Sequence, residues 1–444
     1  MRRCARPPPC SRPTGIASGP RPPARARTLL LLLIASSACV AVALWNAVKP
    51  MPEGTHVVSL PARLADPQLT VLGARDEILS RELADIDRAA QMVVLDELPV
   101  GREIGQRLLL AKRRRPNLKI VVVADSLDEA SGGTPREYFQ ALEQSGVIVA
   151  RIRLDRLRDP TPLYSALWRL GVAWWSDPFE EAPGGLRAAL RRLNLKRDHR
   201  QLIVADDGAG GWISLMPGGG DLAVEIAGGP ARDIAASELE IAAWSTGDDR
   251  LPQAPPAAGR GFGSIDARFL TEGAIRGALL DALGAAAAGD AVSVSAPTLS
   301  ERRVIAAALA AAERGARVAV LLDPDAAPNR AVGAELIRKS SGRIEVRWEP
   351  AGAHGTISLV LVQGRRELWA DVSAAGLTRP ALGDLNLEAA AELRLPEHAA
   401  AARALCDHFA RAWGAAAPYA RYADDSAAAY WRYRLLEAAG LAAF

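Results

Sequence analysis

Two short segments of the chain place a histidine just ahead of an apolar run that is typical of a buried β-strand. The first is DHRQLIVADDG at residues 198–208, with His199, and the second is AHGTISLVLVQG at residues 353–364, with His354. An imidazole can serve as nucleophile, general acid or general base near neutral pH. If the two rings face each other, one can act as a nucleophile while the other protonates the leaving group.

The residue two positions after each histidine is the next candidate for contact with a substrate. On a strand, residues i and i+2 project from the same face, so Gln201 is expected to accompany His199, and Thr356 to accompany His354. Arg200 is then expected to face away. Gln201 can donate a neutral hydrogen bond and Thr356 a shorter one, but neither brings a positive charge to a substrate.

Metal and thiol chemistry find little support in the sequence. Of the four cysteines only Cys406 lies beyond residue 39, and the five histidines are scattered without the spacing of zinc ligand sets. Asp323 and Asp325 flank a proline after an apolar run and resemble paired carboxylate ligands. We interpret them as a turn at a strand end, because Asp-Pro favours turns. We therefore expect no cofactor and no metal.

Positive charge is concentrated at the N-terminus. The first fifty residues hold seven Arg and Lys49 without any Asp or Glu, so the net charge of +3 for the whole chain leaves −5 for the body. A mildly acidic body is a poor match for the phosphate backbones of nucleic acids, which usually bind basic faces. We therefore expect no nucleic-acid partner.

An uncharged apolar run begins at Leu29 and ends at Val48. Its length is about the twenty residues that a helix needs to cross a bilayer. The arginines precede it, so the positive-inside rule predicts a cytoplasmic N-terminus and an outward-facing body. Residues 1–28, rich in Pro and Arg, are expected to be a disordered basic tail. A cleaved signal peptide is the alternative interpretation of the apolar run.

The body repeats one order of elements, which predicts an α/β fold built from two similar lobes. In each half, strands alternate with helices at the spacing of parallel βαβ units. Thr-x-x-Glu spacings at Thr134 and Thr298 predict capping boxes that begin a helix in each half. The predicted strands are residues 92–98, 119–125, 147–152, 291–296, 317–323 and 343–349.

Domain boundaries follow from this duplication. A Pro/Gly/Ala linker at residues 251–262 separates a first lobe, 51–250, from a second lobe, 263–444. Near its end, residues 426–436 are expected to form an amphipathic helix that docks on the body.

At the histidine segments the sequence resembles the phospholipase D superfamily, whose hallmark is His-x-Lys followed four residues later by Asp, once per lobe. The resemblance is closer to bacterial phospholipase D-like and cardiolipin synthase-like proteins, and it runs from about residue 60 to the end. It includes LTRPALGDLNLEAA at residues 377–390, which is similar to a Leu-Thr-Arg…Asn-x-Glu stretch of that family.

The resemblance implies two phospholipase D-like lobes packed face to face after one transmembrane helix. It also implies phospholipid hydrolysis or phosphatidyl transfer through a phosphohistidine, without a cofactor. The expected place is the bacterial inner membrane, with the body periplasmic or extracellular and a phospholipid as substrate or ligand.

Residue by residue, His199 and His354 correspond to the catalytic histidines. Gln201 and Thr356 stand where the family has lysine, and Leu361 stands at the second motif aspartate. The residues expected to support catalysis or bind substrate are Gln201, Asp206, Thr356, Ser373, Thr378, Arg379, Asn386 and Glu388.

The absent lysines leave alternatives open. Loss of a preorganised donor costs about 10²- to 10³-fold in rate, so activity is expected to be reduced or lost unless another cation substitutes. The candidates are Arg379, Arg365 and Arg366. The alternative is an inactive phospholipase D fold that binds anionic lipid or serves as an envelope scaffold, and a nuclease ranks third. The sequence does not assign nucleophile and acid between the two histidines.

Overall fold

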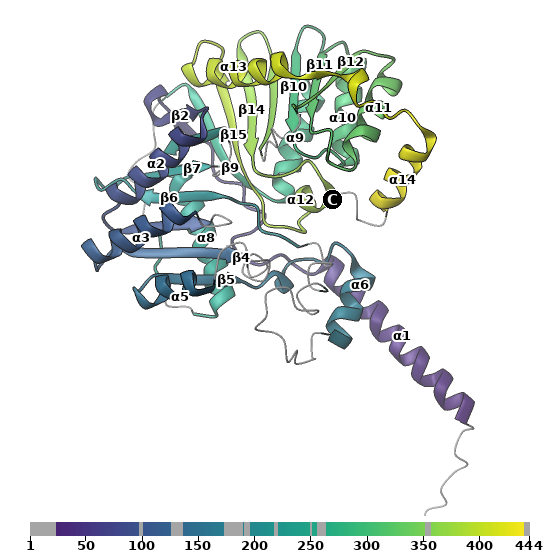
Figure 1. Ribbon diagram of the computed structural model, residues 1–444, viewed down its shortest axis with the longest axis horizontal. Helices are drawn as coiled ribbons and strands as arrows, with labels where there is room; N and C mark the ends of the chain where they lie inside the picture. Colours follow the sequence, from purple (N-terminus) through teal and green to yellow (C-terminus); the bar gives the residue numbers. More distant parts are fainter. Residues whose placement is uncertain are drawn as a thin grey trace, which may run out of the picture.

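The computed structural model describes residues 24–96, 101–125, 136–172, 190, 196–216, 221–248, 251–254, 263–350 and 357–438. Figure 1 shows two lobes side by side and a long helix, α1, that projects from the body. Each lobe is built on one mixed β-sheet.

The first sheet has seven strands in the order β2-β8-β7-β6-β3-β4-β5. Its parallel part is β3, β4 and β5, and the remaining strands are antiparallel to their neighbours. The strands are β2 (Leu69–Leu72), β3 (Met92–Asp96), β4 (Lys119–Asp125), β5 (Ile148–Ile152), β6 (Leu202–Asp206), β7 (Trp212–Met216) and β8 (Ala223–Ala227).

The second sheet has nine strands in the order β1-β9-β15-β14-β13-β10-β11-β12-β16. Here β10, β11 and β12 form the parallel part. The strands are β1 (Ala62–Leu64), β9 (Ile265–Thr271), β10 (Ala291–Ala296), β11 (Arg317–Leu322), β12 (Ile344–Trp348), β13 (Ser358–Gln363), β14 (Glu367–Ser373), β15 (Ala389–Pro396) and β16 (Ala417–Pro418).

The two sheets share one topology. If β9 is matched with β2, β15 with β8, β14 with β7 and β13 with β6, the order of the inner seven strands of the second sheet repeats that of the first. The α/β class and the internal duplication predicted from the sequence are therefore confirmed. The short strand β1 precedes the strands of the first sheet in the chain but pairs with β9 of the second sheet, which ties the lobes together.

Helices cover the outer face of each sheet. The first lobe uses α2 (Arg75–Arg88), α3 (Arg102–Arg114) and α5 (Arg136–Gln144), and the second uses α9 (Gly273–Ala285), α10 (Arg302–Glu313) and α11 (Asn329–Ser340). Each set encloses its own apolar cluster. A third cluster lies between the sheets and includes side chains of α8 (Gly229–Thr246) and α13 (Ala400–Ala415). Because this shared core joins residues of both lobes, the lobes pack face to face.

Helix α10 begins later than the capping-box pattern predicts. Its N-cap is Glu301, whose side chain accepts a hydrogen bond from the backbone N–H of Arg303, so the assignment of Thr298 as the cap is wrong. The backbone of Thr298 is engaged elsewhere, since its carbonyl accepts from the N–H of Leu377 at 2.9 Å. The corresponding pattern at Thr134 and the linker residues 255–262 lie outside the described residues.

Shorter elements complete the chain. Asp325 N–H donates to Asp323 Oδ1 at 2.8 Å, which makes the predicted turn after β11. The predicted C-terminal helix is α14 (Ala427–Ala438), which buries Ala429 and Tyr433 against the body. The remaining elements are α6 (Pro162–Leu167), α12 (Arg379–Leu382), the π-helix η3 (Trp168–Val172) and the 3-10 turns η1 (Asp66–Gln68), η2 (Leu154–Arg156) and η4 (Tyr419–Arg421).

The projecting helix α1 (Ala24–Val48) contains the apolar run found in the sequence. Its segment Thr28–Val48 is long and apolar enough to cross a membrane, and little of it is buried in the protein. A helix at this position fits either an anchor or a signal sequence.

Candidate active site

The first histidine segment is held by the second lobe through a short backbone ladder. Asp198 forms a parallel bridge with Leu387, the N–H of His199 donates to the carbonyl of Leu387 at 2.9 Å, and the N–H of Leu387 donates to the carbonyl of Arg197 at 3.0 Å. The Asn386 side chain extends this ladder, because its Oδ1 accepts from the N–H of Arg197 at 3.1 Å. The site is therefore assembled only when both lobes are in place.

His199 is paired with Glu388 across this ladder. The distance between His199 Nδ1 and Glu388 Oε1 is 3.0 Å, and Asn386 Nδ2 donates to the same carboxylate oxygen at 3.4 Å. Glu388 has no exposed surface, whereas the His199 side chain leaves 42% of its surface open. With Nδ1 donating to the carboxylate, Nε2 is the ring nitrogen left for a substrate.

The charge around His199 favours its protonated form. Burial acts to lower the pKa of His199, but the carboxylates of Glu388, Asp198 and Asp125 act in the opposite direction, and the net result is a pKa above the usual 6.5. Burial also raises the pKa of Asp198, with further contributions from Glu238 and Asp125. The ring of His199 thus lies next to a buried cluster of carboxyl groups that favour its protonated form.

Arg200 is enclosed beneath the histidine and has no exposed surface. Its guanidinium donates to Glu272 Oε1 at 2.8 Å and to Glu238 Oε1 at 2.7 Å. It also donates to Ser237 Oγ at 2.8 Å and to the carbonyl of Gly54 at 3.0 Å. Arg200 is fully engaged with its own protein and is directed away from any phosphate site, as the sequence predicted.

A second histidine–carboxylate pair lies close to the first in the network. His56 Nδ1 is 2.7 Å from Asp384 Oδ1, and Arg158 Nη1 is 3.2 Å from Asp384 Oδ2. Glu272 links the two pairs, because it accepts from the N–H of His56 at 2.6 Å and from the N–H of Glu388 at 3.1 Å. The sequence analysis missed this group, since nothing in the spacing of His56 distinguishes it from an ordinary surface histidine.

Residues with a strained backbone conformation are concentrated around these two histidine–carboxylate pairs. Among the described residues, five that are not glycine have positive φ, and four of them are His56 at 53°, Gln201 at 44°, Glu272 at 47° and Asp384 at 61°. A side chain with a Cβ rarely adopts this conformation unless its surroundings enforce it, and such residues cluster at functional sites. This strain marks the region between the lobes as the candidate site.

The expectation that His199 and Gln201 share a strand face is wrong. Strand β6 begins at Leu202, and the positive φ of Gln201 breaks the extended backbone on which the i, i+2 rule depends. Gln201 is half-buried, and its Oε1 has no hydrogen-bond partner among the described residues. An orphaned polar atom beside His199 is a feature that a ligand could satisfy.

Asp206 lies at the opposite end of β6 from His199. Its carboxylate accepts backbone N–H groups from Ala90 at 2.9 Å, Gln91 at 2.7 Å, Met92 at 2.7 Å and Gly208 at 3.2 Å. These bonds fix the turn that leads into β3. Asp206 therefore supports the lobe rather than contacting a substrate.

His354 and Thr356 lie outside the described residues, so the structure gives no position for the second histidine. The turn that follows β14 is described. Ser373 is buried and donates to Asp371 Oδ1 at 3.4 Å, and Thr378 caps α12 by accepting from the N–H of Ala381 at 3.4 Å. Both side chains are therefore engaged within the protein.

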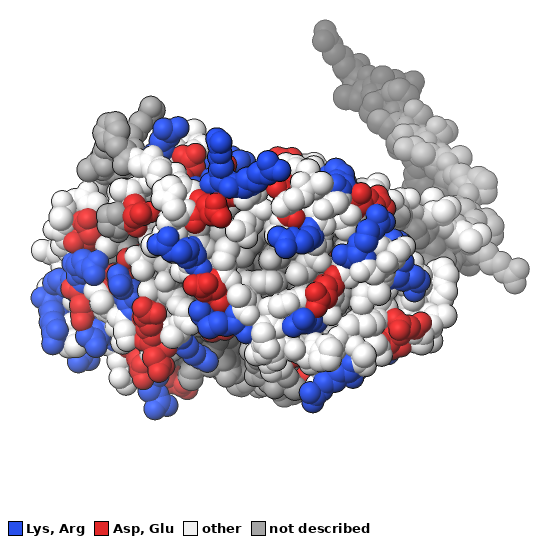
Figure 2. Space-filling model, turned by 90° about the horizontal axis from the view of Figure 1, so that it is seen from above, with Lys and Arg blue, Asp and Glu red and all other residues white. Residues whose placement is uncertain are grey.

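The candidate replacement cations differ in position. Arg365 and Arg366 are exposed in the turn between β13 and β14, at the end of β13 remote from residue 357. They cannot substitute for a motif lysine. Arg379 is exposed at the start of α12, and no ion pair of its side chain is found within the described part of the chain. Figure 2 shows basic and acidic side chains interspersed on one face of the molecule.

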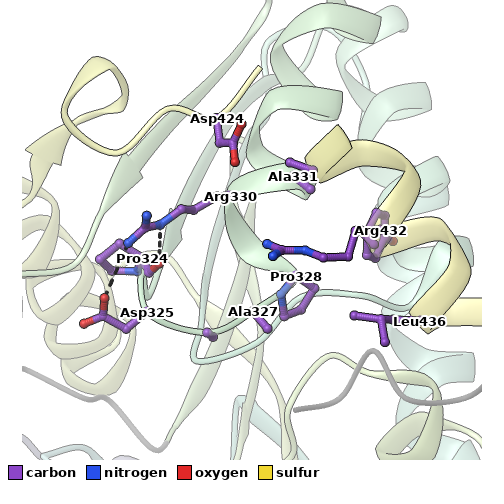
Figure 3. Close-up of a pocket in the computed structure, with 12 residues that line it drawn as sticks. Pro324, Asp325, Ala327, Pro328, Arg330, Ala331, Asp424, Arg432 and Leu436 are labelled. Atoms are coloured by element: carbon purple, nitrogen blue, oxygen red, sulfur yellow. Dashed lines mark hydrogen bonds and ion pairs between the residues drawn. The ribbon is translucent and has the colours of Figure 1, made fainter. Parts of the chain in front are cut away.

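A cavity of about 370 Å³ lies elsewhere, between the turn after β11 and α14 (Figure 3). None of the predicted site residues lines it. Its Arg330 is already held by the carbonyl of Pro324 at 2.7 Å and by Asp325 at 3.6 Å. We therefore place the candidate site at the contact between the lobes and not at this cavity.

Comparison with known proteins agrees with the duplicated α/β fold. Residues 279–413 match the family described as "Cardiolipin synthase, PLD-like domain", in which PLD denotes phospholipase D. The match lies in the second lobe, which therefore resembles a phospholipase D-like domain. No curated protein sequence matches it.

Comparison with solved structures finds one with a similar two-lobed architecture. Phosphatidylserine synthase from Haemophilus influenzae Rd KW20 is 12% identical, with a TM-score of 0.54, and the match covers 87% of this chain and 97% of that one. Nuc, a phospholipase D family member from Salmonella typhimurium, is 19% identical with a TM-score of 0.30 over 35% of this chain and 99% of its own. The first of these supports the assignment of the two-lobed fold.

Proposed function

We propose that this protein acts on phosphodiesters of membrane phospholipids, by hydrolysis or phosphatidyl transfer, through His199 and His354. The observation that supports this most directly is the pairing of His199 Nδ1 with the buried Glu388 carboxylate at 3.0 Å. That pairing orients the ring and leaves Nε2 available to phosphorus. The names of the matched family and of phosphatidylserine synthase both denote phospholipid-synthesising enzymes.

The proposed reaction has two displacements. In the first, one histidine nitrogen attacks phosphorus, the bond from phosphorus to the leaving oxygen breaks, and the other histidine gives that oxygen a proton. In the second, water or an alcohol loses its proton to the second histidine and attacks phosphorus, and the phosphorus–nitrogen bond breaks. Water yields hydrolysis, and the hydroxyl of another lipid yields transfer.

The two lysine positions of the family motif supply no positive charge to stabilise the phosphate oxygens during the reaction. Gln201 occupies the first lysine position of the family motif and supplies no charge, and Thr356 occupies the second. We assign Arg379 as the side chain that approaches the phosphate from the second lobe, because it is exposed beside Thr378 and forms no ion pair within the described residues. Asn386 is assigned to hold Glu388 in place, on the basis of its 3.4 Å bond to that carboxylate.

The absence of both motif lysines also favours a second function, which is lipid binding without catalysis. A site with oriented histidines but little positive charge is suited to bind an anionic lipid headgroup without turning it over. The protein would then be an inactive phospholipase D fold that serves as a lipid-binding scaffold. Binding of phosphatidylglycerol vesicles without any product would support this alternative.

We assign α1 as a single-pass anchor with its N-terminus in the cytoplasm of a bacterial cell. This rests on the 21-residue apolar span and on the arginines that precede it. The mass of the mature protein extracted from membranes tests the assignment, because a cleaved signal sequence would remove α1.

The function is tested with the purified full chain and vesicles of phosphatidylglycerol. We expect release of glycerol or formation of cardiolipin, and a phosphoramidate adduct on a histidine peptide after alkaline quenching. His199→Ala is expected to lower turnover by at least about 10³-fold, since it removes a reacting group. His354→Ala is expected to do the same.

The matched control is His398→Ala, because His398 is exposed after β15 and belongs to no site described above. It should leave turnover unchanged. Absence of any product, or equal activity of the His199→Ala variant and the unaltered chain, would refute catalysis and favour the lipid-binding alternative.

A further inference from the structure

The C-terminal half of α1 is covered by another helical segment of the body. α6 packs against α1, as Figure 1 shows, and continues without a break into the π-helix η3, so residues 162–172 form one helical segment. Tertiary hydrogen bonds fix this pair. The N–H of Asp159 donates to the carbonyl of Asn46 at 3.0 Å, and Lys49 Nζ donates to the carbonyl of Asp155 at 2.7 Å.

The burial pattern along α1 shows where the covered part begins. Leu29 to Ile34 are between 56% and 66% exposed, and the helix stays exposed as far as Ser37. After that point one stripe is withdrawn from the surface, at Ala38, Cys39, Val42, Ala43 and Asn46. Spacings of three and four residues place these positions on one side of the helix.

The length of the uncovered part is too short to span a bilayer. Residues 28–37 extend about 15 Å at 1.5 Å per residue, whereas the hydrocarbon core of a bilayer is about 30 Å thick. If α1 crosses the membrane, the stretch covered by residues 162–172 has to supply the other half of the thickness. That segment is then brought into the leaflet on the side of the body.

The outer surface of the segment suits this environment. Leu167 is 60% exposed and Leu170 is 46% exposed, so the segment presents two large apolar side chains at its surface. Its one charged residue, Arg169, is paired with Asp159 through two hydrogen bonds of 3.1 Å and also donates to the carbonyl of Asp155 at 2.8 Å. Such pairing beside Lys49 is typical of charges at the headgroup level.

We propose that residues 162–172 are a second membrane element, which inserts Leu167 and Leu170 among the acyl chains of the body-side leaflet next to the C-terminal half of α1. The proposal rests on the assignment of α1 as a retained anchor and goes beyond it. Two membrane elements restrict the orientation of the body relative to the bilayer more than α1 alone would.

The insertion also fixes the position of the candidate site relative to the membrane surface. Arg158 connects the two, because its Nε donates to the carbonyl of Lys49 at 2.9 Å and its Nη1 is 3.2 Å from Asp384. Asp384 in turn binds His56, whose N–H donates to Glu272 at 2.6 Å, and Glu272 binds the backbone of Glu388. The ring of His199 is therefore held near the membrane surface, where a lipid phosphodiester lies.

The test uses the full chain with its four cysteines replaced by serine and one new cysteine at Leu170, labelled with a fluorophore. The protein is reconstituted in vesicles of phosphatidylethanolamine and phosphatidylglycerol that contain a nitroxide in the acyl chain. We expect the nitroxide lipid to quench the Leu170→Cys probe about as strongly as a probe at Leu44→Cys on α1, and aqueous iodide to leave both bright. A probe at Leu167→Cys should behave in the same way.

The control is Leu110→Cys on α3, at the opposite side of the molecule from α1 in Figure 1. It should be quenched by iodide and not by the lipid. If the Leu170 and Leu167 probes behave like the Leu110 probe while the Leu44 probe stays in the lipid, the second membrane element is refuted and the anchor stands. If the Leu44 probe is also in water, both the anchor and this inference are lost.

Discussion

Arg200 of the first lobe and Glu272 of the second are joined by an ion pair of 2.8 Å, and neither side chain has any exposed surface. The pair lies directly beneath the histidine that the site depends on, because Arg200 follows His199 in the chain and Glu272 accepts from the N–H of Glu388 at 3.1 Å. The contact between the lobes thus combines a buried ion pair with the shared apolar cluster.

Removal of Arg200 should destabilise the whole molecule. The Arg200→Met variant leaves the carboxylates of Glu238 and Glu272 buried without their cation, and breaking a buried pair costs about 3–5 kcal/mol of unfolding free energy. Chemical denaturation monitored by tryptophan fluorescence measures this loss. The control is Arg197→Met, because Arg197 is a half-buried neighbour that forms no ion pair within the described part of the chain, and this variant should lose little stability. Equal stability of the two variants would mean that the ion pair does not hold the lobes.

Glu388→Gln should lower the pKa of His199. The carboxylate is the main group that raises this pKa against the effect of burial, so its removal shifts the equilibrium toward the neutral ring. NMR titration of ¹³C-labelled histidine measures the pKa directly, and the His199 signal is assigned by its absence in His199→Ala. The limb of the pH–rate profile that reports His199 should move to lower pH, with a loss of about 10²-fold in turnover. An unchanged pKa in the variant would show that Glu388 does not set the protonation of the ring.

Gln201→Lys should increase activity if Gln201 faces the phosphate. One preorganised charged donor is worth about 10²- to 10³-fold in rate, and the strained backbone at Gln201 makes a gain of about 10-fold the more realistic expectation. Turnover of phosphatidylglycerol measures the effect. Gln201→Met, which has similar length but no donor, is the matched control and should not gain. A lysine variant no faster than the methionine variant would place position 201 outside the reaction.

Asp371 should make the protein less stable as the pH rises. Burial and the nearby Glu392 raise the pKa of Asp371 to about 8, well above the value of 3.8 in an unfolded chain. The folded state therefore holds a proton that the unfolded state loses between these two values, and stability falls as the pH increases through this window. The slope is about 1.4 kcal/mol per pH unit for one proton.

Asp371→Asn removes this proton linkage and should flatten the decline of Tm between pH 5 and about 8. Thermal unfolding in detergent at several pH values measures it, and Asp281→Asn on the exposed side of α9 serves as the control. If the asparagine variant follows the same pH dependence as the unaltered chain, Asp371 does not titrate in the folded state.

The sequence by itself determined the architecture, because the architecture depends on local patterns. Apolar runs of strand length, the helices between them and the repetition of their order predicted the parallel parts of both sheets, and the apolar run after the arginines predicted α1. Each of these signals is a property of a few neighbouring residues. The predicted helix start at Thr298 was wrong. The helix is capped by Glu301, because the backbone of residues 298–301 is first held by hydrogen bonds to Leu377.

The sequence also pointed to His199, Asn386 and Glu388 as site residues, through spacing and through resemblance to a family. Only the tertiary structure decided how they are related. It joins residues 197–199 and 386–388 by backbone hydrogen bonds between the lobes. It also buries the Arg200 side chain, which binds Glu272 of the second lobe. It also gives Gln201 a positive φ, so this residue is not part of strand β6. It places His56 and Asp384 in the hydrogen-bond network of His199, and it packs residues 162–172 against α1. These relationships join parts of the chain that are far apart in sequence, so no local pattern records them, and they exist only once the shared core has formed.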